Sequence, residues 1–139
     1  MTTEITFTPI GTVLEASGPT AGEDRFADRR EKIGIFPEYR EGLTGLAAGD
    51  SIQILFHFHQ SDGYELVTLS RGRGTVTGVF NCRSPRRPNG IGIDEVKIVS
   101  VADGVLVIDG GDMLPGTPIL DIKPWNMGPG PGHMHGRKP

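Results

Sequence analysis

One glycine- and proline-rich segment, "NCRSPRRPNGIG" at residues 81–92, places a dense group of arginines between two apolar stretches. Pro85 and Pro88 restrict its backbone, while Asn89, Gly90 and Gly92 permit conformations that other residues rarely adopt. Such a loop could hold backbone amides and guanidinium groups in fixed positions around an anion. The segment therefore predicts an anion-binding site, although arginines in a surface loop can also serve only to keep a turn solvated.

Positive charge is concentrated in the same region of an otherwise acidic chain. The net charge of the 139 residues is −3, yet no Asp or Glu lies between Glu65 and Asp94. We call the arginines of this stretch the basic window: Arg71, Arg73, Arg83, Arg86 and Arg87. Clustered guanidinium groups of this kind are the electrostatic signature of a phosphate-bearing partner.

Other chemistry-bearing residues give weaker signals. His57 and His59 lie two residues apart on a predicted strand and so point to the same face, but no third ligand stands at a recognisable spacing. We therefore predict no metal site and interpret the pair as a polar patch that faces a pocket or a partner subunit. Cys82 has no histidine at a spacing typical of a nucleophile pair, and we interpret it as a small buried residue that ends a strand. The glycine fingerprints of dinucleotide-binding and P-loop proteins are absent from the sequence.

The segments that must position these residues are predicted to be strands, because apolar and polar side chains alternate along them with a period of two residues. In "SIQILFHFHQ" the side chains alternate, with Ile52, Ile54, Phe56 and Phe58 on one face, as in a half-buried strand. Asp103-Gly104 provides the turn residues of a tight hairpin, and residues 37–46 predict a short helical turn. We predict an all-β fold, a small and mostly antiparallel β-barrel with long loops. The predicted strands are residues 5–14, 33–36, 51–60, 66–69, 75–82, 95–101, 105–109 and 118–122.

Length and composition indicate one domain, which we place at residues 1–126. Residues 18–32 predict a long surface loop, and residues 127–139 predict a flexible Gly/Pro/His tail. The single cysteine and the lack of an export signal or a long apolar segment favour a cytoplasmic protein without membrane association.

Two long motifs in the same order and spacing resemble the TsaA-like family, whose best known members are the TrmO tRNA methyltransferases. They are "GVFNCRSPRRPNGIGIDEVKI" at residues 78–98 and "DMLPGTPILDIKPW" at residues 112–125. The resemblance implies a dimeric, β-barrel methyltransferase that uses S-adenosylmethionine and modifies the N6 atom of the adenosine beside the tRNA anticodon. The tRNA would bind through the basic window. Alternatives are methylation of a small nucleophile, suggested by the acidic net charge, and a non-enzymatic S-adenosylmethionine-binding module.

The resemblance also implies site residues. Four positions in the two motifs depart from the family pattern: Gly90 stands in place of Pro, Ile93 in place of Leu or Met, Asp94 in place of Ser, and Trp125 in place of Tyr. Asp94 also joins the groups that could accept a proton from the acceptor nitrogen. The predicted catalytic residues are Asp121, Asn89, His57 and His59. The predicted cofactor-binding residues are Phe58, His59, Arg83, Ser84, Pro85, Arg87, Asn89, Ile91, Gly92, Gly116, Thr117, Asp121, Ile122, Lys123 and Trp125.

Overall fold

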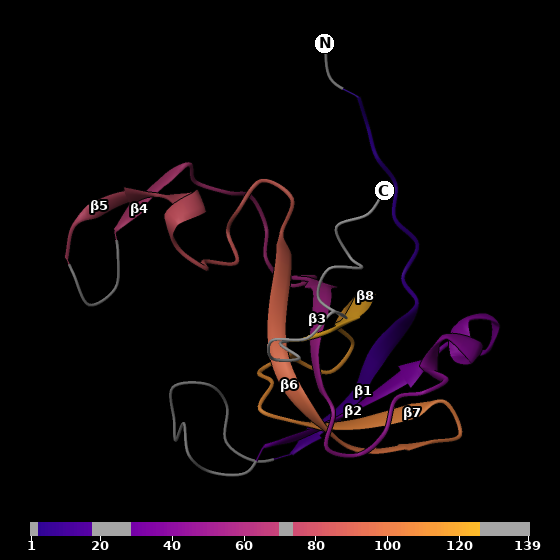
Figure 1. Ribbon diagram of the computed structural model, residues 1–139. Helices are drawn as coiled ribbons and strands as arrows, with labels where there is room; N and C mark the ends of the chain where they lie inside the picture. The colour runs from indigo at the N-terminus through magenta and orange to yellow at the C-terminus, as the bar shows by residue number, and fades with distance from the viewer. Residues whose placement is uncertain (1–2, 18–28, 70–73, 126–139) are drawn as a thin grey trace, which may run out of the picture.

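The computed structural model describes residues 3–17, 29–69 and 74–125. Eight strands and two short 3₁₀ helices make up these ranges, and Figure 1 shows their arrangement. The strands are β1 (Gly11–Ser17), β2 (Arg30–Ile35), β3 (Ser51–His57), β4 (Val67–Leu69), β5 (Val76–Gly78), β6 (Ile91–Ala102), β7 (Val105–Asp109) and β8 (Pro118–Pro124). The 3₁₀ helices are η1 (Pro37–Leu43) and η2 (Val79–Asn81).

Six strands form a closed barrel in the order β1-β2-β7-β6-β3-β8, and every pair in it is antiparallel. The ring closes unevenly. β3 pairs with β6 over its whole length, whereas β1 and β8 pair only through Gly11–Ile119 and Thr12–Pro118. The predicted antiparallel barrel is confirmed.

The barrel forms because apolar side chains alternate along its strands and turn inward together. On β3, Ile52, Ile54 and Phe56 are buried, as the alternation in "SIQILFHFHQ" predicts. These side chains are part of one core, which includes Val13, Ile33, Ile35, Ile52, Ile54, Phe56, Val96, Ile98, Leu106, Ile108, Met113 and Ile119.

The hairpin between β6 and β7 is confirmed at the predicted turn. Asp103 and Gly104 have φ angles of 54° and 77°, the left-handed conformation that a two-residue turn of this kind requires. Asp tolerates this region better than most residues, and Gly adopts it without a steric penalty.

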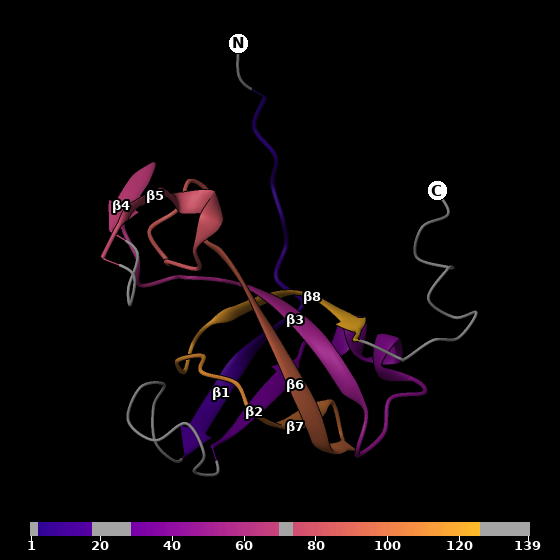
Figure 2. The same cartoon turned by 60° about the vertical axis from the view of Figure 1, so that its left-hand side comes forward.

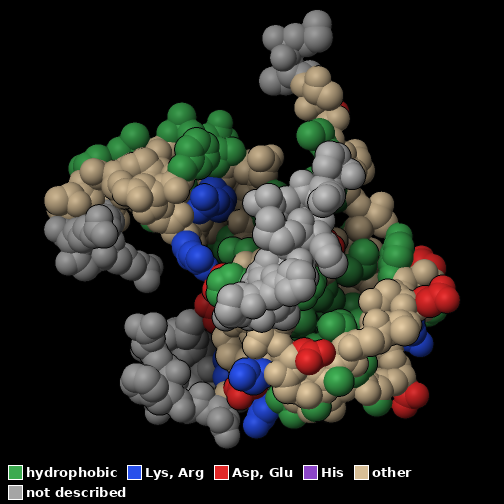
Figure 3. All heavy atoms as spheres, in the orientation of Figure 1, with side chains coloured by type: hydrophobic (Ala, Val, Ile, Leu, Met, Phe, Trp, Pro, Cys, Tyr) green, Lys and Arg blue, Asp and Glu red, His purple; other side chains and the backbone are tan. Residues whose placement is uncertain are grey.

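A second sheet of two strands, β4 and β5, stands apart from the barrel, as both ribbon views show (Figures 1 and 2). Its side chains and those beside it are apolar but solvent-exposed, with Val76 exposed to 71% and Phe80 to 80%. Green side chains gather over this region at the upper left of Figure 3. A two-stranded sheet has little intrinsic stability in water, so this exposed apolar surface requires an explanation.

Several predicted boundaries are wrong. The predicted strand at 51–60 ends at His57, and the one at 95–101 begins already at Ile91. Residues 5–10 do not belong to a strand: only Ile10 bonds to its neighbours, Ile119 and Phe36, and Pro9 has no amide to donate. The predicted loop at residues 18–32 ends too late, since β2 begins at Arg30 and pairs with both β1 and β7. The predicted strand at residues 75–82 ends at Gly78, where the chain turns into η2. Residues 18–28 and the predicted tail lie outside the described residues. Within the described ranges, no helix is long and apolar enough to cross a membrane.

Candidate functional site

The arginine-rich loop is held in shape by one of its own arginines. Arg87 donates from Nη1 to the carbonyl oxygens of Cys82, at 2.9 Å, and Ser84, at 3.2 Å. The amide of Gly90 in turn donates to the Arg87 carbonyl at 3.1 Å. Arg87 therefore closes the loop on itself, and two prolines stiffen the backbone between these contacts. Arg83 makes no hydrogen bond or ion pair with the described residues, so its guanidinium group is available to a ligand.

Two glycines determine how this loop meets the barrel. Gly90 has a φ of +62°, which a proline, fixed near −65°, cannot adopt. Gly90 therefore allows a backbone conformation in this loop that the proline of the family pattern could not adopt. At Gly92, a Cβ atom would lie only 2.5 Å from the Phe56 ring and 2.7 Å from the Phe58 ring. A side chain there would collide with the two aromatic rings, which pack edge to face with centroids 5.1 Å apart.

A cavity of about 530 Å³ opens between this loop and one end of the barrel. This volume lies within the range of sites that hold ligands of nucleoside size. The cavity gathers five of the predicted cofactor-binding residues, Phe58, Arg83, Arg87, Ile91 and Gly92. The rest of its lining is Phe56, Phe80, Asn81, Cys82, Ile93, Asp94 and Asp112. Aromatic and aliphatic walls thus meet cationic and anionic groups in one space. In Figure 3, Lys and Arg side chains border the hollow between the small sheet and the barrel.

Two further cavities adjoin the same strand end. One of about 800 Å³ is lined by His57, Asn89 and the N-terminal segment from Thr3 to Pro9. Another of about 230 Å³ is lined by His59, Pro85 and Thr117, among others. The histidine pair therefore lies between cavities, consistent with the interpretation of a polar patch that faces a pocket. Cys82 is half-buried, follows η2 instead of ending a strand, and lines the 530 Å³ cavity.

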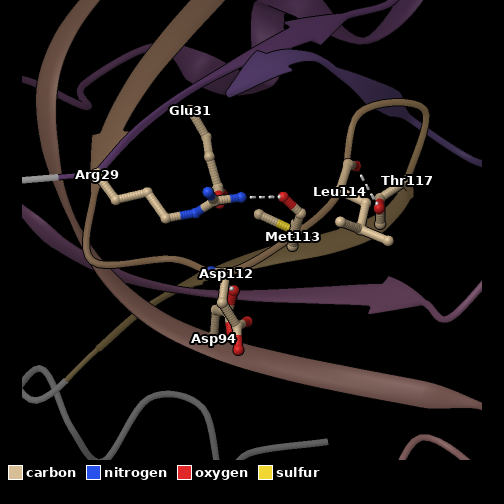
Figure 4. A network of polar contacts seen from close by, with 7 residues as sticks. All are labelled: Arg29, Glu31, Asp94, Asp112, Met113, Leu114 and Thr117. Atoms are coloured by element: carbon tan, nitrogen blue, oxygen red, sulfur yellow. Dashed lines mark hydrogen bonds and ion pairs between the residues drawn. The ribbon is translucent and has the colours of Figure 1, made fainter. Parts of the chain in front are cut away.

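The residues of the second motif, 112–125, lie in two separate parts of the structure. Gly116 and Thr117 lie near the arginine-rich loop, with His59 Nε2 3.5 Å from where a Gly116 Cβ would be. Thr117 is buried and donates its hydroxyl to the Leu114 carbonyl at 2.6 Å, a contact that shapes the turn before β8 (Figure 4). Its hydroxyl proton is therefore engaged within the chain.

β8 then runs away from the loop. Asp121 accepts from the Ile122 amide at 2.9 Å and pairs with Lys123 at 2.8 Å, so its carboxylate is engaged locally. Trp125 bonds through its amide to Ser51, at the opposite end of β3 from His57. Ser51 and His57 are six residue steps apart along the strand, a span of roughly 20 Å. Asp121, Ile122 and Lys123 line a separate cavity of about 350 Å³ beside η1. The site roles assigned to these residues stay predictions.

Sequence analysis named Asp94 as a possible proton acceptor but missed the charged residues near it, Glu31, Asp112 and Arg29. Asp94 projects inward from β6 on the same face as Val96 and Ile98, and Glu31 projects inward from β2 on the same face as Ile33. Figure 4 shows these carboxyl groups together with Asp112 and Arg29. The missed signal was alternation itself, because Glu31 and Asp94 each occupy a position where the strand pattern demands an apolar residue.

The carboxyl groups perturb one another. The Asp112 amide donates to Asp94 Oδ2 at 3.2 Å. Arg29, which is buried, donates from Nε to Glu31 Oε2 at 3.0 Å and from Nη2 to the Met113 carbonyl at 2.8 Å. Burial, and then the charge of Asp112, raises the pKa of Asp94 to about 7. Burial also raises the pKa of Glu31, against the opposing effect of its hydrogen bond from Arg29. Asp94 therefore carries a proton for part of the time at neutral pH.

No cluster of three or more His, Cys, Asp or Glu side chains suited to a metal ion occurs in the described part of the chain.

Fold and site together define a small antiparallel β-barrel protein with a cavity at one end, between a strand and an arginine-rich loop. The model of the tRNA-methyltransferase O N-terminal domain matches residues 18–128. The chain belongs to this family.

Relatives and solved structures agree with the assignment. A probable S-adenosyl-L-methionine-binding protein of Methanothermobacter thermautotrophicus is 33% identical over 125 residues, which cover 88% of this chain and 90% of the relative. The tRNA (adenine(37)-N6)-methyltransferase of Mus musculus is 43% identical over 94 residues, which cover 66% of this chain but 22% of that enzyme. The crystal structure of TrmO from Pseudomonas aeruginosa superimposes with a TM-score of 0.64 at 29% identity, covering 88% of this chain and 56% of that one.

Proposed function

We propose that this chain transfers a methyl group from S-adenosylmethionine to the N6 atom of the modified adenosine beside a tRNA anticodon. The broader class follows from family membership: the chain is an S-adenosylmethionine-dependent methyltransferase. The choice of tRNA as acceptor is drawn from relatives named as tRNA (adenine(37)-N6)-methyltransferases, of which this chain spans about a fifth. Such an enzyme works where tRNA is, in the cytoplasm.

The residues of the 530 Å³ cavity fit this cofactor. Phe56, Phe58 and Phe80 offer aromatic surface to an adenine ring, and Arg83 offers a guanidinium group with no bonding partner in the described chain to a carboxylate. Asp94 and Asp112 offer negative charge to a cation in the same space. The bound cofactor would supply an electrophilic methyl group, and this mixture of aromatic, cationic and anionic groups is the observation that carries the proposal.

The chain's own contribution is to position the two reactants and exclude water. Gly92 lets the loop approach the phenylalanine rings closely, and Arg87 keeps the loop in one conformation. His57, Asn89 and His59 border the adjoining cavities and are therefore the candidates to orient an acceptor nitrogen and receive its proton.

The basic window supports an RNA acceptor. Arg83 is exposed and lines the cavity, where it could contact a phosphate, and Arg86 is exposed in the same loop and lies 3.8 Å from Glu65. Arg71 and Arg73 lie outside the described residues. Phosphate contacts by arginines contribute much of the affinity for nucleic acid and make it dependent on salt.

The proposal is tested by nucleoside mass spectrometry of tRNA from cells with and without this protein. Loss of one N6-methylated adenosine in the deletion strain, restored by the wild-type chain, is the expected result. A tRNA modification profile that is identical in both strains would contradict tRNA as the acceptor and would favour a small nucleophile, which labelled cofactor with thiol or amine acceptors would then identify.

A further inference from the structure

A carboxyl group that faces inward at the end of a barrel core needs a compensating charge or a proton. Asp94 is such a group: its neighbours on the same face of β6, Val96 and Ile98, belong to the hydrophobic core. The side chain lies at the inner end of the 530 Å³ cavity, next to Asp112. Its position therefore links the core to the space in which the proposed cofactor would bind.

Asp94 and Asp112 act as a pair. The backbone amide of Asp112 reaches Asp94 Oδ2 at 3.2 Å, and Figure 4 shows the two carboxyl groups side by side. Asp112 is exposed to solvent from the cavity, whereas Asp94 is half-buried behind it. The negative charge of Asp112, added to the effect of burial, favours the protonated form of Asp94 and raises its pKa.

A second, independent observation concerns a third carboxyl group beside the pair. The side chain of Glu31 is fully buried, and its Oε1 atom has no hydrogen-bond partner. A Cβ atom at Gly111 would lie 2.5 Å from this Oε1 and 3.3 Å from Asp94 Oδ2, so both oxygens point toward the same spot. A buried carboxylate oxygen without a partner, aimed at the Asp94–Asp112 pair, increases the demand for positive charge there.

Three arginines lie near the pair. Arg29 is engaged by Glu31 Oε2 and the Met113 carbonyl. Arg87 is engaged by the carbonyls of its own loop, and Arg83 lies with that loop in the cavity lining. The charged groups that face Asp94 are therefore Asp112, Glu31 and Arg29 from the barrel and Arg83 and Arg87 from the loop.

We propose that Asp94 and Asp112 bind the positively charged sulfonium end of S-adenosylmethionine and that Asp94 releases its proton when the cofactor binds. This inference rests on the proposed function. The methionine carboxylate would face Arg83, which lines the same cavity. The released proton passes to solvent, and the sulfonium charge takes its place. Because S-adenosylhomocysteine has a neutral sulfur, the pair favours the methyl donor over the spent product and promotes product release.

The titration of Asp94 makes this exchange measurable. Its pKa of about 7 means that roughly half of the molecules carry the proton at pH 7 without a ligand. A bound cation favours the ionised form and lowers this pKa, so proton release at pH 7 approaches about 0.5 per molecule bound.

Calorimetry in two buffers of different ionisation enthalpy, phosphate and Tris at pH 7, measures the protons released. The wild-type protein is expected to release about half a proton with S-adenosylmethionine and distinctly less with S-adenosylhomocysteine. Asp94→Asn is expected to abolish this difference and to reduce the preference for the methyl donor about fivefold. Glu95→Gln is the matched control, because Glu95 is the next residue on β6, is exposed and does not line the cavity. It should behave as the wild type.

Asp112→Asn provides a second variant at an exposed position, should Asp94→Asn fold poorly, and it is expected to reduce proton release as well. Equal proton release with both ligands in the wild type, or unchanged release in both variants, would overturn the inference while leaving the proposed function intact. Failure of the folded wild-type protein to bind either ligand would overturn the proposed function itself and the inference with it.

Discussion

Arg87 and Cys82 are joined by a hydrogen bond from the guanidinium Nη1 to the backbone carbonyl, 2.9 Å long, which closes the arginine-rich loop on itself. The abundance of guanidinium in this loop therefore serves two purposes. Arg87 shapes the loop, and Arg83, with no bonding partner among the described residues, faces the cavity.

The two arginines should respond differently to replacement by alanine. Arg83→Ala is expected to weaken S-adenosylmethionine binding by about 1.5–3 kcal/mol with an unchanged melting temperature, because it removes a charged partner from an exposed position. Arg87→Ala is expected to weaken binding and also to lower the free energy of unfolding by about 1 kcal/mol, because two loop carbonyls lose their donor. Calorimetry and thermal unfolding of both variants measure these effects. An Arg83→Ala variant that binds like the wild type would show that this guanidinium does not contact the cofactor.

Asp94 should make stability depend on pH. Its pKa is raised from 3.8 to about 7, so the folded chain binds this proton more tightly than the unfolded chain. The stabilising contribution is complete below about pH 4 and is lost as the pH rises through 7. Asp94→Asn should remove this dependence and raise the free energy of unfolding above pH 7 by on the order of 2–4 kcal/mol relative to the wild type.

Denaturant unfolding between pH 4 and 8 provides the measurement, with Glu95→Gln as the control that retains the wild-type slope. Parallel stability curves for the wild type and Asp94→Asn would show that the carboxyl group titrates normally in the folded chain.

The left-handed turn at Gly90 should tolerate no other residue well. Gly90→Ala is expected to lower the free energy of unfolding by about 1 kcal/mol, since φ is +62° and the added Cβ would lie 3.4 Å from the His57 ring. Gly90→Pro is expected to cost more, because proline cannot adopt this φ. Gly42→Ala is the control, as no atom lies within 4 Å of its added Cβ and its φ is not positive. Equal melting temperatures for the Gly90 and Gly42 variants would contradict the proposed loop conformation.

We predict that the chain forms a homodimer whose contact lies close to the cofactor site. The apolar side chains of Val67, Leu69 and Val76 on the small sheet are more than half exposed in the described part of the chain. A second copy of the chain would cover them. Sedimentation at micromolar concentration should give a dimer, and Val76→Lys should shift it toward monomer. Val99→Lys, on the barrel, is the control. A monomeric wild type at saturating cofactor would contradict this prediction.

Local signals in the sequence were sufficient for most of the barrel. Alternation predicted β3, and Asp103-Gly104 predicted the β6–β7 turn, because both depend on neighbouring residues. The start of β1 depended on which strands lie beside it, so residues 5–10 were assigned wrongly. The cluster of Glu31, Asp94 and Asp112 could not be predicted, because it joins three segments that only the closure of the barrel brings together. Resemblance assigned Gly92, Arg87 and Trp125 to one cofactor site. Gly92 and Arg87 line one cavity, whereas Trp125 lies at the other end of β3, a separation that the sequence motifs could not reveal.

Methyl transfer to RNA tests the central claim most directly. Purified wild-type protein is incubated with methyl-labelled S-adenosylmethionine and tRNA from the deletion strain, and the tRNA is then digested to nucleosides for mass spectrometry. The account predicts label on the N6 atom of one modified adenosine, with salt-sensitive rates and reduced labelling in Arg83→Ala. Folded protein that binds the cofactor but leaves this tRNA unlabelled, while it methylates a small thiol or amine, would contradict it.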